Sequence, residues 1–154
     1  MPAPLIHRFP SGLQALLLPL PHAVTASVSV FVRSGSVHEP RALNGIGHVV
    51  EHMVFKGTRS RTAHQLNLDA ERRGAEVNAH TDKDHSAFHM RGLPPHALEF
   101  LPMLADLLLA PTFPADELER ERQVLLQEFA EDEDDPMSAS SRRRSSESCA
   151  RRTC

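Results

Sequence analysis

The segment His48-Val49-Val50-Glu51-His52 constrains the fold of this 154-residue chain more than any other. At about 100° per residue, a helix places His48 and His52 about 40° apart on one face, with Glu51 beside them. The opposite side of the same helix is apolar and carries Val49, Val50, Met53 and Val54. We therefore predict a helix over residues 47–56, ended by Gly57, with one face for a core and one for chemistry.

The polar face of this helix suits a metal ion. Two imidazoles one turn apart can reach the same zinc ion, which binds histidine nitrogen at about 2.0–2.1 Å. The carboxylate of Glu51 could then take a proton from a water whose pKa zinc lowers to about 7. The order H-x-x-E-H is a catalytic signature. Two histidines four residues apart also occur on ordinary solvated helices, so both interpretations stay open at this point.

A third metal ligand is predicted on the last helix of the chain, which begins near Pro114. Glu121 and Glu128 lie about 20° apart around a helix, within an arc that carries Leu118 and Leu125. A buried carboxylate is costly unless it is paired or binds a metal. We expect Glu128 to bind the metal and Glu121 to orient a metal-bound histidine. The alternative is a salt bridge to an arginine in the core.

The rest of the chain mixes strand and helix signals without strict alternation. A hairpin is predicted around the turn Pro10-Ser11-Gly12, and period-two alternation over residues 24–33 predicts a strand with one buried face. Further strands are expected at 76–81 and 85–91, and further helices at 62–73 and 94–110, with a kink or break at Pro102. This mixture predicts an α+β fold of two layers, a largely antiparallel sheet with helices packed on one side.

Composition changes abruptly at Met137. Residues 137–154 hold six serines, five arginines and both cysteines, and their net charge is +4, whereas residues 1–136 carry −7. The terminal segment has too little apolar surface to offset its ordering entropy. We therefore predict a domain over residues 1–136 and a disordered basic tail over 137–154. The domain has no cysteine, so no thiolate can act there as ligand or nucleophile.

Several other functions are disfavoured by the sequence. No apolar run approaches the roughly 20 residues of a membrane-spanning helix. The basic tail could touch nucleic acid through charge alone, without a recognition motif, so no specific nucleic-acid partner is expected. The apolar stretch 13–20 is a poor secretory signal, which favours a cytoplasmic location over a secreted or periplasmic one. Three further histidines are interpreted as solvated strand residues rather than a second metal site: His80, His85 and His89.

The residues around the metal helix resemble the pitrilysin/insulinase family of zinc peptidases. The matching stretch runs from Gly45 to Thr58. Upstream, Gly35, Ser36 and Glu39 resemble the segment that precedes this helix in the family. Residues 74–81 resemble the edge strand of the family, and residues 121–128 with 134–136 resemble its distal ligand helix. The resemblance covers roughly residues 5–136. One departure is Gly47, where the family usually has alanine, which loosens the helix start by up to about 1 kcal/mol.

The resemblance implies a metal site and a reaction. One zinc ion per chain would be bound by His48, His52 and Glu128, with Glu51 as the general base and Glu121 supporting a ligand. The implied reaction is hydrolysis of a peptide bond by zinc-activated water.

The resemblance also implies a substrate and a partner. Asn78 and Ala79 would lie on a strand that pairs with the backbone of an extended peptide. Family members join this unit to a homologous second half, on the same chain or on a partner chain. Here the resemblance ends after Pro136, where the tail resembles an out-of-frame terminus, so we expect full activity to require a second half. The alternative is a non-catalytic remnant or subunit that keeps the fold and the metal.

Overall fold

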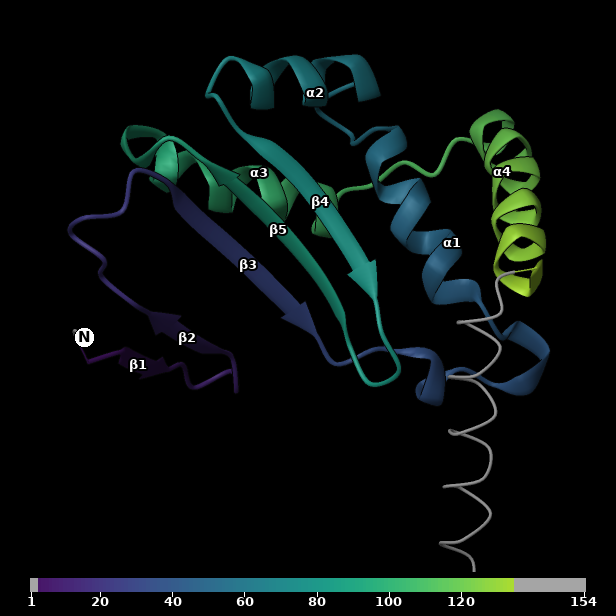
Figure 1. Ribbon diagram of the computed structural model, residues 1–154, viewed down its shortest axis with the longest axis horizontal. Helices are drawn as coiled ribbons and strands as arrows, with labels where there is room; N and C mark the ends of the chain where they lie inside the picture. Colours follow the sequence, from purple (N-terminus) through teal and green to yellow (C-terminus); the bar gives the residue numbers. More distant parts are fainter. Residues whose placement is uncertain (1–2, 135–154) are drawn as a thin grey trace, which may run out of the picture.

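The computed structural model describes residues 3–134 of the chain. Its strands form two antiparallel sheets (Figure 1). The larger sheet has the order β3-β5-β4, and the smaller is a hairpin of β1 and β2. The strand bounds are β1 Leu5–Arg8, β2 Gln14–Leu17, β3 Ala26–Val32, β4 Glu76–Thr81 and β5 Ser86–Gly92. The α+β class and the antiparallel pairing predicted from the sequence are both confirmed.

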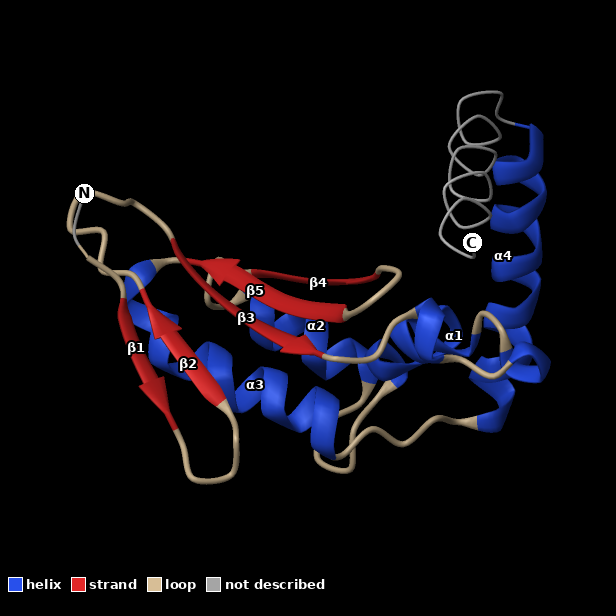
Figure 2. Ribbon diagram, turned by 90° about the horizontal axis from the view of Figure 1, so that it is seen from below, coloured by secondary structure: helices blue, strands red, loops and turns tan. Residues whose placement is uncertain are grey.

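Two of the helices, α2 and α3, lie on one side of the larger sheet, whereas α4 stands beside the sheet (Figure 2). The metal helix of the sequence is α1, Ile46–Met53, and it continues as the 3-10 turn η3, Val54–Lys56. The other helices are α2 Ala63–Glu71, α3 Ala97–Leu109 and α4 Ala115–Asp134, with short 3-10 turns at η1 Ser36–His38, η2 Arg41–Leu43 and η4 Pro94–His96. No helix within residues 3–134 is long and apolar enough to cross a membrane.

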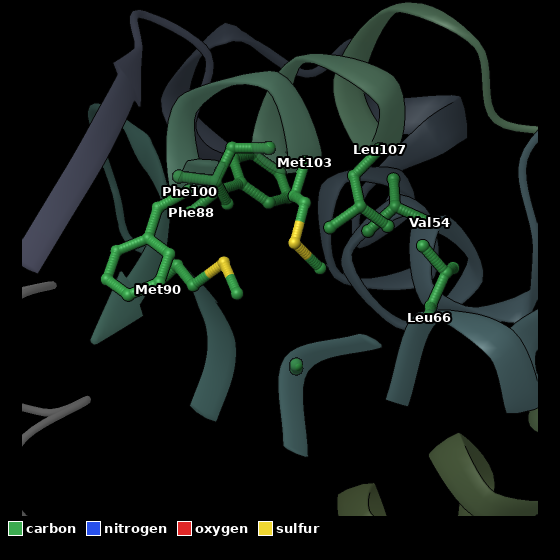
Figure 3. Packing of buried hydrophobic residues seen from close by; sticks show 9 residues of the cluster. Val54, Leu66, Phe88, Met90, Phe100, Met103 and Leu107 are labelled. Carbon is green, nitrogen blue, oxygen red and sulfur yellow. The ribbon is translucent and has the colours of Figure 1, made fainter. Parts of the chain in front are cut away.

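The core forms between α3 and the inner face of the larger sheet (Figure 3). Phe100, Met103 and Leu107 of α3 meet Phe88 and Met90 of β5. The inner face also carries the alternating apolar residues of β3, while the serines between them turn to the opposite face. Val54 of η3 and Leu66 of α2 belong to the same cluster. The C-terminal end of α1 is therefore anchored in the core.

The structure settles one alternative that the sequence left open and shows one feature that the sequence did not predict. Of the two outcomes predicted for Pro102, a break is excluded, because α3 is one helix that runs through it. The missing N–H of Pro102 leaves the carbonyl of Leu98 without its helical partner, and Leu98 is 91% exposed, so water can serve that carbonyl. The hairpin forms where predicted, but its apolar residues Leu5, Ile6, Leu16 and Leu17 remain exposed. The predicted tail, residues 137–154, lies outside the described residues.

Candidate metal centre

The start of α1 is held by a carboxylate from the preceding loop. Glu39 accepts hydrogen bonds from the N–H groups of Gly45, at 2.6 Å, and Gly47, at 2.7 Å. These N–H groups belong to the first turn of the helix, where a negative charge also meets the positive end of the helix dipole. A Cβ at residue 47 would lie 2.8 Å from Glu39 Oε1. Glycine at this position therefore leaves room for the carboxylate that fixes the helix start.

Three ligand atoms from α1 and α4 converge on one point. His48 Nε2 lies 3.2 Å from His52 Nε2. Glu128 Oε2 lies 3.7 Å from the first and 3.6 Å from the second of these nitrogens. Ligand atoms of a tetrahedral zinc ion, bound at about 2.0–2.1 Å, are about 3.3 Å apart. The residues predicted from the spacing therefore form a group that could hold a metal ion, and the donor set of two imidazoles and a carboxylate fits zinc.

A buried carboxylate supports this group from α4. Glu121 is 8% exposed, and its Oε2 lies 2.9 Å from His52 Nδ1. Its other oxygen forms an ion pair with Lys56 Nζ. Burial raises the pKa of Glu121, but hydrogen bonds from Lys56 and His52 outweigh it and hold that pKa below its usual range. An ionised Glu121 accepts the proton of Nδ1, which leaves Nε2 of His52 with a lone pair toward the group.

The outcome for α4 corrects one prediction and refines another. The alternative prediction, a salt bridge from Glu121 to an arginine in the core, is wrong, because Glu121 pairs with Lys56. The arc predicted to be buried is only partly so: Glu121 and Leu125 are buried, whereas the side chain of Glu128 is 44% exposed. Helix α4 contacts α1, and Glu121 lies in that contact, where it meets His52 and Lys56. Glu128 is thus open to solvent on one side.

The remaining predicted site residues lie outside the ligand group. Glu51 is on α1, half-buried, one residue before His52. Asn78 and Ala79 are on β4, which is an edge strand of the larger sheet. The side-chain oxygen of Asn78 accepts the backbone N–H of Ala79 at 2.8 Å. That hydrogen bond occupies a main-chain donor on the strand predicted to pair with peptide.

Sequence reasoning missed two residues of this region, Lys56 and Glu39. Lys56 follows His52 by four residues, as His52 follows His48, so the same spacing could have placed it on the metal-binding face. The clue to Glu39 is Gly45 at the N-cap of α1, a position where a side chain usually caps the helix. Such a start needs an acceptor from elsewhere.

Three protein ligands that leave one position open for water are typical of catalytic zinc sites, and two histidines with one carboxylate are such a set. The chain belongs to the family described as Insulinase (Peptidase family M16), whose family model matches residues 15–152. This match extends past Met137, where we predict the tail to begin.

Individual relatives agree with this assignment. The chain is 35% identical over 126 residues to the uncharacterized zinc protease YmxG of Bacillus subtilis, covering 82% of this chain and 31% of that protein. It is 34% identical over 131 residues to mitochondrial-processing peptidase subunit beta of Blastocladiella emersonii, covering 85% and 28%. A protease from Helicobacter pylori, known from its crystal structure, matches with a TM-score of 0.81 and 26% identity, over 90% of this chain and 34% of that one. The chain thus spans about a third of the length of these relatives.

Proposed function

We propose that this chain is the metal-binding unit of a zinc-dependent endopeptidase that hydrolyses extended peptides. The observation that carries the proposal is the convergence of His48 Nε2, His52 Nε2 and Glu128 Oε2 within 3.2–3.7 Å of one another. Zinc held by these three atoms supplies a Lewis acid and a water of lowered pKa. The names of the relatives as zinc proteases support the same metal and reaction class.

Glu51 is the proposed general base. It precedes His52 on the same helix, yet it is not one of the three ligand residues, so its carboxylate remains able to take a proton from the attacking water. The same group then returns a proton to the amine of the leaving peptide. Glu121 holds the ring of His52 through Nδ1, and Lys56 holds Glu121. These two residues keep one ligand oriented while the proton moves.

The proposed peptide site is the free edge of β4. Within the described residues β4 pairs with β5 on one side, so its other edge can add an extended peptide through main-chain hydrogen bonds. The contact between Asn78 Oδ1 and the Ala79 N–H must open before that donor can serve a peptide. A homologous second half or a partner subunit is proposed to complete the enzyme, because this chain spans only about a third of its relatives.

A second candidate function is a non-catalytic subunit. It is favoured by 34% identity over 109 residues to cytochrome b-c1 complex subunit 1 of Bos taurus, a protein named for the complex that contains it. That match covers 71% of this chain and 23% of the bovine protein.

One experiment separates the two functions. The zinc-loaded chain and its Glu51→Gln variant are compared on a quenched-fluorescence peptide, with Glu71→Gln, an exposed glutamate of α2, as the control. Loss of a general base is expected to lower the rate by about 10²–10⁴-fold, with zinc content unchanged and the control at the unaltered rate. The assay is run with a homologous second half supplied, because full activity is proposed to require one. Equal rates for the chain and Glu51→Gln under that condition would overturn the peptidase proposal and support the non-catalytic subunit.

A further inference from the structure

We propose that His80, together with His85 or His89, forms a second, weaker transition-metal site on the outer face of the larger sheet. The outer face is the side of β3, β4 and β5 that turns away from α2 and α3. The sequence alone favoured solvated histidines here. The structure adds the geometry that brings both neighbouring rings close to that of His80, and the site is independent of the proposed peptidase function.

The strand register places one histidine between the other two. His80 of β4 lies opposite Ala87 of β5, so its diagonal neighbours on the same face are His85 and His89. Diagonal pairs on one face of an antiparallel sheet are within reach of long and aromatic side chains. The ring centroid of His80 lies 5.8 Å from that of His85 and 6.3 Å from that of His89. Both neighbours thus approach the same central ring.

These separations are close to those of imidazoles that share an ion. With nitrogen bound at about 2.0–2.1 Å in tetrahedral geometry, two ring centroids are about 5.2 Å apart. Each pair that includes His80 therefore needs to close by about 1 Å or less, which rotation of an exposed side chain can supply. His85, the residue before β5, and His89 are four positions apart, about 13 Å along an extended chain, so an ion binds His80 together with one of these two neighbours. Their ligand atoms do not yet converge as those of His48, His52 and Glu128 do. Because ordering these side chains opposes binding, the site is weaker than the one on α1 and α4.

A carboxylate prepares one of the two neighbours of His80. His85 Nδ1 lies 2.7 Å from Asp84 Oδ1, so the carboxylate accepts the Nδ1 proton and leaves Nε2 as the free donor atom. The negative charge of Asp84 also favours a bound cation. Phe31 of β3 contacts the ring of His85 at 5.7 Å between centroids and limits its rotation. Imidazole donors suit borderline divalent ions such as Zn²⁺, Ni²⁺ and Cu²⁺.

The test is a zinc titration followed by calorimetry and by histidine ring NMR. The intact chain is expected to bind a second equivalent of Zn²⁺, and that equivalent should shift the ring resonances of His80 and of at least one of His85 and His89. His80→Asn should weaken the second equivalent at least tenfold, since it removes the central ligand. His64→Asn is the control, because His64 is an exposed histidine of α2, and it should change nothing.

A His48→Ala/His52→Ala variant keeps this test separate from the proposed function. The variant should lose the first equivalent and retain the second. Failure of the proposed metal centre would appear as absence of the first equivalent from the unaltered chain, without effect on the second. The second site is overturned if no second equivalent binds, or if His80→Asn and His64→Asn bind it equally, which is the result for adventitious zinc on scattered histidines.

Discussion

Two groups of histidines in this molecule differ in how closely their possible metal-binding atoms converge, and we call the first, His48 and His52 with Glu128, the prepared group. On α1 and α4, donor atoms of His48, His52 and Glu128 already lie 3.2–3.7 Å apart. On the outer face of the sheet, the ring centroid of His80 lies 5.8 Å from that of His85 and 6.3 Å from that of His89, whereas the ring centroids of His48 and His52 are 4.8 Å apart. Helical spacing fixes the first pair on one stripe, whereas diagonal strand positions leave the second group wider.

The supporting contacts differ even more than the spacing. His52 is held by Glu121, a buried carboxylate that is itself paired with Lys56. His85 is held by Asp84, whose side chain is 80% exposed. A hydrogen bond in a partly buried setting restrains a ring far better than one that water competes for. The comparison teaches that the second layer of contacts, more than the count of histidines, decides how strongly each group should bind.

Removing a ligand from the prepared group should have the largest effect. His52→Ala removes both a metal-binding nitrogen and the hydrogen bond to Glu121. Zinc affinity is therefore expected to fall by more than about 100-fold, which exceeds the loss expected when only a residue that orients a ligand is removed. Competition with a chromogenic chelator measures it. His80→Asn is the matched control and should leave the tighter site unchanged. If both variants weaken the tight site equally, the two groups are not separate sites.

Removing the charge of Glu121, which orients His52, should have the second-largest effect on zinc affinity. Glu121→Gln keeps the size of the side chain but loses the charge that faces His52 and Lys56. Zinc affinity should fall about 10–100-fold, and the visible spectrum of the Co²⁺-loaded chain should change because the ring of His52 is less restrained. Glu119→Gln, on the exposed side of the same helix, controls for the loss of a charge on α4. An unchanged Co²⁺ spectrum and affinity would show that Glu121 has a structural role alone.

Much of this prepared group follows from local spacing. The placement of His48, His52 and Glu51 needs only 100° per residue, and the seven-residue separation of Glu121 and Glu128 puts both on one face of α4. The strands β4 and β5 follow from their period-two pattern and their flanking turns. Local rules suffice wherever the residues that interact share one element.

What the sequence does not fix is contact between elements. The pairing of Lys56 with Glu121 joins residues 65 positions apart and depends on how α4 packs against α1. The partial exposure of Glu128 has the same origin. The three outer-face histidines became neighbours only through the register of β4 and β5, which alternation alone does not set.

Asp106, which ties the loop after η3 to α3, should make a smaller, pH-dependent contribution to the stability of the fold. Asp106 of α3 accepts hydrogen bonds from Thr58 Oγ1 at 2.8 Å and Ser60 Oγ at 2.7 Å, and pairs with Arg61 at 3.0 Å. Burial raises the pKa of Asp106, but these partners outweigh it and hold that pKa below its usual range. The loop that follows α1 and η3 is thereby tied to the core helix.

Asp106→Asn should lower the free energy of unfolding by about 1 kcal/mol at pH 7, because asparagine keeps an acceptor oxygen and loses only the part of the hydrogen-bond strength that the charge adds. Because the folded-state pKa is depressed, this contribution is complete above the unfolded pKa near 3.8 and is lost as pH falls through the folded value. Urea unfolding at pH 7 and at pH 3 measures it. Asp116→Asn, at an exposed position of α4, is the control. A difference that grows on acidification would contradict the assignment.

The smallest effect on zinc affinity is expected from removing Asp84, the exposed carboxylate that orients His85. Asp84→Asn removes the charge that faces His85 Nδ1, but water already competes for that contact, so the second zinc equivalent should weaken by no more than about fivefold. Calorimetry of the second equivalent measures this, with Asp82→Asn in the same turn as the control for charge. A loss as large as that of Glu121→Gln would break the comparison, because an exposed carboxylate would then restrain a ligand as well as a buried one. A loss well below it would show that burial of the supporting carboxylate is what distinguishes the two groups.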